Sequence, residues 1–148
     1  MSVRNWFELR LRVPYDAVDM MQIVHHSGYV VWFEMARVEH ARSLGIDFKD
    51  LVLNRGLATA MTEIKLNFHS PSRFDEEILV KTRIASAGNS STKFECQILK
   101  LSANSHPSSR ALLCSDFAIL VLVDTKTGKP TPIPKDISKK IASNLGFD

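Results

Sequence analysis

The chain has 148 residues, a length that one domain of ordinary size accounts for. Its hydrophobic fraction of 45% and charged fraction of 24% are typical of globular proteins, and six Gly and six Pro exclude a collagenous or low-complexity chain. The net charge is only +3 and the basic residues are spread along the chain, so we expect no nucleic-acid partner. The N-terminus lacks the apolar core of a signal peptide, and no apolar run approaches the length of a membrane span. A cytoplasmic protein without stable membrane insertion is therefore expected.

The N-terminal part predicts one strand, one loop and one long helix. Apolar and charged residues alternate over residues 7–13, as in a half-buried strand. Residues 14–28 show no steady period and are expected to form a loop. Apolar residues at helical spacing then run from Tyr29 to Leu44, which predicts a buried helix of about 16 residues with Ser27 as its N-cap.

The rest of the chain predicts mainly strands, after a short helical or irregular piece. Period-two alternation covers residues 62–68, 78–84 and 93–98, while residues 111–123 are almost continuously apolar, as in a central strand covered on both faces. A short helix is expected over residues 135–144.

These elements predict an α+β fold, in which a five-stranded antiparallel sheet wraps around one long central helix. Short connections favour antiparallel neighbours, and one helix against one sheet is a stable layer arrangement. Such a sheet leaves edges and one face uncovered. We therefore expect a homo-oligomer, either a dimer or a tetramer.

Polar residues concentrate in the loop before the long helix, where Asp16, Asp19, His25 and His26 lie close in sequence. A helix N-terminus directs free backbone N–H groups and a partial positive charge at whatever binds there. Amides that polarise a carbonyl, together with a carboxylate and a histidine, are suited to hydrolysis. The alternative is that these side chains only form turns and caps, and spacing alone does not decide between the two.

Three segments resemble the signature of the hotdog-fold acyl-CoA thioesterases, in the 4-hydroxybenzoyl-CoA thioesterase superfamily and especially its YbgC-like branch. They are residues 13–19 (VPYDAVD), 23–29 (IVHHSGY) and 32–37 (WFEMAR). A further block at residues 71–76 (PSRFDE) resembles a turn of the same family. The resemblance covers nearly the whole chain and implies a single hotdog domain over residues 1–148.

The resemblance also implies a site and an activity. Asp19 matches the family's catalytic carboxylate, and His26 matches the histidine that the YbgC-like branch keeps. Tyr29 and Arg73 match substrate-binding positions, with Arg73 near the entrance for CoA. The implied activity is hydrolysis of a fatty or aromatic acyl-CoA, with a backbone amide near His26 polarising the thioester carbonyl. No metal or redox cofactor is implied.

Three departures from the family pattern lie in the same loop. Ala17 replaces an Asp, Gln22 replaces a Gly and Gly28 replaces an Asn. Glycine is often chosen where the backbone φ must be positive, so the Gln22 difference bears on how the loop aims Asp19. The alternative function is therefore a non-catalytic module that binds acyl-CoA or acyl carrier protein.

Other chemically capable residues are expected to be structural. His25 and His26 lack the spacing of a metal site. His40 falls on the apolar face of the predicted helix and is expected to be a core histidine with its hydrogen bonds made. Cys96 alternates with apolar residues, as a small core hydrophobe does. Asp116 interrupts the longest apolar strand and needs a partner if it is buried.

Overall fold

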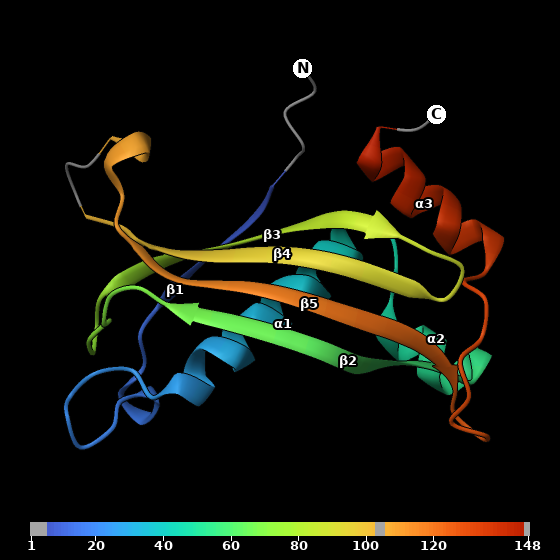
Figure 1. Cartoon of the computed structure of the whole chain (residues 1–148), viewed down its shortest axis with the longest axis horizontal. Coiled ribbons are helices and arrows are strands. Elements are labelled where there is room, and N and C mark those ends of the chain that lie inside the picture. The colour runs from blue at the N-terminus through green and yellow to red at the C-terminus, as the bar shows by residue number, and fades with distance from the viewer. Residues whose placement is uncertain (1–5, 103–105, 147–148) are drawn as a thin grey trace.

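The structure is a computed structural model that describes residues 6–102 and 106–146 (Figure 1). Five antiparallel strands form one sheet in the order β1-β3-β4-β5-β2. The strands are β1 (Phe7–Arg12), β2 (Leu57–Phe68), β3 (Glu77–Ala87), β4 (Ser91–Lys100) and β5 (Leu112–Asp124). This sheet confirms the predicted α+β architecture.

One long helix, α1 (His26–Ser43), runs across one face of the sheet (Figure 1). The short piece after it forms α2 (Phe48–Arg55), and the predicted C-terminal helix is present as α3 (Lys135–Leu145). Within the described ranges, no helix is both long enough and apolar enough to cross a membrane.

The predicted start of the long helix and its Ser27 cap are wrong. The helix begins at His26, and His25 is the N-cap, because its ring nitrogen Nδ1 accepts a hydrogen bond from the Ser27 N–H at 3.2 Å. The Ser27 hydroxyl lies 2.8 Å from the same nitrogen. The imidazole ring of His25 thus accepts the capping hydrogen bond that a Ser, Thr, Asp or Asn side chain accepts at most helix starts.

The second strand begins five residues earlier than the alternation predicts. Leu57 pairs with Asp124 at its start, and the register shifts between Met61 and Glu63. A β-bulge interrupts the alternation of side chains between the two faces of a sheet. The period-two pattern is therefore visible only after the bulge, from residue 62 onward.

The core lies between α1 and the sheet. Phe33 and Ala36 of α1 are fully buried, as are Ile78 and Val80 of β3 and Ile98 of β4. Burying a large apolar side chain contributes about 1.5–3 kcal/mol relative to leaving it exposed. This packing fixes α1 on the sheet and with it the position of the helix N-terminus.

Among the described residues, no strand pairs with the outer edge of β2. This strand has 12 residues. Three of its apolar residues, Met61, Ile64 and Phe68, are 41%, 40% and 55% exposed. Val31 and Met35 of α1 are exposed as well. Exposed apolar side chains along an unpaired edge are a common feature of surfaces that meet another chain.

Candidate active site

The loop between β1 and α1 folds back on itself and carries Asp19 at its turn. Val18 and Val24 form an antiparallel bridge, and the Asp19 N–H donates to the Ile23 carbonyl at 2.9 Å. The Val24 N–H donates to the Ser72 carbonyl at 2.8 Å, which ties the loop to the turn between β2 and β3. The backbone thereby holds Asp19 close to the start of α1.

The Asp19 carboxylate is held by its own turn. Its Oδ1 accepts a hydrogen bond from the Met21 N–H at 2.8 Å, and its carbonyl accepts one from the Gln22 N–H at 2.9 Å. Gln22 has φ +63°, in the left-handed region. The position where the family pattern has Gly therefore does take a positive φ in this chain, with a side chain present.

The first backbone amide of α1 is free to bind a ligand. The Ser27 and Gly28 N–H groups donate to the ring and carbonyl of His25. The His26 N–H has no partner in the part of the chain that the structure describes. The N-terminus of a helix carries a partial positive charge, so this amide is suited to a carbonyl oxygen that becomes negative.

An open pocket brings three of the four predicted site residues together. Asp19, His26 and Tyr29 line it. Further walls come from the loop, from the end of β2 and from the segment that follows β2: Ile23, Val24, Phe68, His69, Ser70 and Pro71. The His26 ring is exposed and lies against the His25 ring, with 4.0 Å between the ring centroids.

Tyr29 forms a buried aromatic wall. Only 4% of it is exposed, and its ring centroid lies 5.7 Å from that of Trp32 and 5.8 Å from that of Phe68. Burial raises the pKa of the Tyr29 phenol, so the group stays protonated and neutral. The wall therefore suits an uncharged acyl group.

Arg73, the fourth predicted site residue, does not line this pocket. It lies exposed in the turn between β2 and β3, and its side chain makes no hydrogen bond or ion pair with the described residues. The structure thus brings Asp19, His26 and Tyr29 together and leaves Arg73 exposed outside the pocket, two residues after Pro71, which lines it.

Phe68 and His69 line the pocket but were not predicted as site residues. Strand alternation marked Phe68 only as a strand residue. The signal available was their place directly before the Ser-Pro turn, which the Val24–Ser72 hydrogen bond brings next to the Asp19 loop. His69 Nε2 also lies 3.1 Å from the Ser115 hydroxyl.

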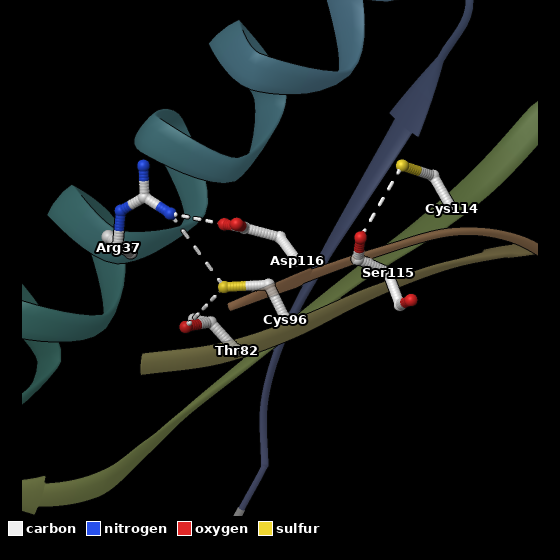
Figure 2. A network of polar contacts seen from close by, with 6 residues as sticks. All are labelled: Arg37, Thr82, Cys96, Cys114, Ser115 and Asp116. Atoms are coloured by element: carbon white, nitrogen blue, oxygen red, sulfur yellow. Dashed lines mark hydrogen bonds and ion pairs between the residues drawn. The ribbon is translucent and has the colours of Figure 1, made fainter. Parts of the chain in front are cut away.

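Asp116 lies away from the pocket, in a buried ion pair (Figure 2). Its Oδ2 accepts a hydrogen bond from Arg37 Nη1 at 2.8 Å. The same Arg37 nitrogen lies 3.9 Å from Cys96 Sγ, which donates to the Thr82 hydroxyl at 3.2 Å. Burial raises the pKa of the Cys96 thiol to about 11, so it is not a thiolate nucleophile. These contacts agree with structural roles for Asp116 and Cys96.

His40 is a core residue, but its predicted hydrogen bonding is incomplete. It is 2% exposed and stacks on Phe7 with 5.3 Å between ring centroids. Its Nδ1 has no hydrogen-bond partner among the described residues. Burial lowers the pKa of His40, so the ring is neutral.

Residues 6–102 and 106–146 contain no group of three or more His, Cys, Asp or Glu arranged to hold a metal ion.

Most of this chain is similar to known proteins. The model of the thioesterase-like superfamily matches residues 13–141. The Synechocystis protein sll0410 is 32% identical over 97 residues, which make up 66% of this chain and 58% of that protein. The acyl-CoA thioester hydrolase YbgC of Escherichia coli O6:H1 is 28% identical over 131 residues, covering 88% of this chain and 92% of the hydrolase.

A solved structure shares the fold. The DHNA-CoA thioesterase of Staphylococcus aureus superposes with a TM-score of 0.81 at 19% sequence identity, over 95% of each chain. The family model's match, by contrast, runs from the loop that carries Asp19 into α3.

Proposed function

Because the chain belongs to the thioesterase-like superfamily, we propose that it hydrolyses acyl-CoA thioesters to the free acid and CoA. The observation that carries the proposal is the placement of the Asp19 carboxylate and the start of α1 at one open pocket. The similarity to an acyl-CoA thioester hydrolase also favours the predicted thioesterase over the non-catalytic binding module.

In the proposed reaction, the thioester carbonyl oxygen accepts a hydrogen bond from the His26 N–H. Asp19 then takes a proton from a water whose oxygen attacks the carbonyl carbon, or itself attacks to form an anhydride that water opens. In both routes the carbon–sulfur bond breaks, and the departing thiolate takes up one proton. The products are one carboxylic acid and the CoA thiol. The His26 ring orients the substrate or assists the proton transfer.

The walls of the pocket support a fatty or aromatic acyl group. Val24, Tyr29 and Phe68 supply apolar surface next to Asp19. Arg73, exposed and unpaired in the adjacent turn, is suited to attract the CoA phosphates at the surface. Acyl-CoA is therefore the substrate class proposed, with acyl-carrier-protein thioesters as the second candidate.

A panel of short, long and aromatic acyl-CoA and acyl-carrier-protein thioesters tests this function, with release of free thiol as the measurement. We expect thiol release from at least one class of acyl-CoA. Saturable binding of acyl-CoA without thiol release across the whole panel would favour the binding module instead.

Replacing His26 by Ala is expected to lower kcat/KM less than replacing the Asp19 carboxylate does. The backbone amide of residue 26 survives the substitution, so the carbonyl is still polarised. A general acid or base contributes about 10²–10⁴-fold, and an assisting group less. Steady-state hydrolysis by His26→Ala measures the effect. If kcat/KM stays within about twofold of wild type, the His26 side chain has no part in the reaction.

We also propose that the active protein is a dimer or tetramer joined along β2, whose edge and apolar side chains are uncovered. Light scattering at micromolar concentration is expected to give at least the mass of a dimer. Ile64→Glu, which puts a charge on this edge, is expected to shift the population toward monomers. A wild-type monomer would contradict the proposal.

A further inference from the structure

Gln22 has a backbone conformation that its side chain disfavours. Among the residues that the structure describes, only Gln22 and Asp75 are non-glycine residues with positive φ, at +63° and +67°. Residues with a Cβ atom rarely occupy this region. The Gln22 side chain is exposed and makes no hydrogen bond within the described ranges, so no side-chain hydrogen bond compensates for the conformation.

This conformation closes the loop that carries Asp19. A four-residue turn runs from Asp19 to Gln22, because the Gln22 N–H donates to the Asp19 carbonyl. The carbonyl of the next residue, Ile23, then accepts a hydrogen bond from the Asp19 N–H at 2.9 Å. In hairpin loops of this length, one left-handed residue after the turn brings the chain back into register. Gln22 is that residue.

The closed loop fixes one oxygen of the carboxylate and leaves the other free. Met21, at the centre of the turn, donates its N–H to Asp19 Oδ1 at 2.8 Å. The second oxygen, Oδ2, makes no hydrogen bond with the described residues. Since Asp19 lines the pocket with His26 and Tyr29, a carboxylate held by Oδ1 can act there through Oδ2.

We propose that Gln22 is a positioning residue, whose left-handed backbone keeps the Met21 amide on Asp19 Oδ1 so that Oδ2 is the oxygen that acts on the thioester or its attacking water. This inference rests on the proposed function. It assigns the role to the backbone conformation of Gln22 and not to its side chain.

Two substitutions with opposite backbone preferences test the proposal. Gln22→Gly accepts positive φ freely, and its kcat is expected to stay within about twofold of wild type. Gln22→Val strongly disfavours positive φ. Its kcat is expected to fall by about 10- to 100-fold, the scale of a misplaced reacting group, while KM changes by less than about threefold. Gln22→Thr is a second β-branched variant if Gln22→Val unfolds.

Asp75→Val is the matched control. It places the same β-branched side chain at the other non-glycine residue with positive φ, in a turn that does not line the pocket. Thermal unfolding is expected to detect a loss of stability in both Val variants. Only Gln22→Val is expected to lose kcat.

The Asp19→Asn background separates the possible failures. There, Gln22→Val is expected to cause less than about twofold further loss, because both substitutions act through one carboxylate. Normal kcat in Gln22→Val, an equal loss in Gln22→Gly, or an undiminished further loss in the Asp19→Asn background would each overturn the positioning role. Full activity of Asp19→Asn would instead overturn the proposed catalytic carboxylate.

Discussion

Asp19→Asn is expected to lower kcat by at least about 10²-fold, the low end for losing a positioned base. Asn has nearly the same size but no negative charge, so it can neither attack the thioester nor act as a strong base. Its side-chain oxygen can still accept the Met21 N–H, and the loop is therefore expected to keep its shape. KM should change much less, since the pocket walls and the helix-start amide remain.

Steady-state hydrolysis of the best acyl-CoA by the purified variant measures this effect. Asp16→Asn is the control, because Asp16 is exposed in the same loop and does not line the pocket with His26 and Tyr29. A larger loss in Asp16→Asn than in Asp19→Asn would mean that the catalytic carboxylate is placed wrongly.

Asp116→Leu is expected to lower the free energy of unfolding by about 3–5 kcal/mol, as breaking a buried ion pair does. Both partners are almost inaccessible, with 3% of the Arg37 side chain and 0% of the Asp116 side chain exposed. Two Arg37 nitrogens, Nε and Nη2, already lack partners among the described residues. Without Asp116, the guanidinium would be a buried charge with no carboxylate beside it.

The double variant Arg37→Met/Asp116→Leu is expected to recover most of that loss. Replacing both charges with apolar side chains removes the desolvation cost together with the attraction. Urea unfolding of wild type, both single variants and the double variant forms a complete cycle. A double variant that is less stable than either single variant would show that the pair itself is a net source of stability.

The stability of the Arg37→Met variant is expected to depend on pH, and the pKa of Asp116 determines the direction. Burial raises the pKa of Asp116 even beside Arg37, and removing the cation takes away the main influence that lowers it. A carboxyl whose folded pKa lies above its unfolded value supports the folded state most when it is protonated. The stability of Arg37→Met is therefore expected to decrease as pH rises above the ordinary Asp pKa of about 4.

Alternation and helical spacing predicted most of the fold because they report burial on one face. Residues 78–84 and 93–98 alternate and lie within β3 and β4. The apolar run at 111–123 lies in β5, an interior strand between β4 and β2, but buried and half-buried residues alternate along most of β5, so the predicted burial on both faces is wrong. The start of β2 could not be predicted in this way, because the bulge near Met61 breaks the alternation. The start of α1 was missed because a histidine ring provides the cap.

The site was only partly predictable, since it combines segments distant in sequence. The resemblance pointed to Asp19, His26 and Tyr29 within one stretch, and these do share a pocket. The contribution of Phe68 depends on the contact between residues 24 and 72, which no local pattern encodes. The partner of Asp116 was unknown from sequence for the same reason: Arg37 lies 79 residues away.

The strand order has a consequence for how the chain folds during synthesis. The edge strand β2 pairs only with β5, so that Thr62, for example, meets Ile119, 57 residues later. At about 5–20 residues per second, a ribosome needs about 3 to 11 s to make that interval. Through this time, the Met61, Ile64 and Phe68 side chains and the backbone of β2 have no strand to pair with. The nascent chain is therefore most exposed to self-association after β2 is made and before β5 emerges.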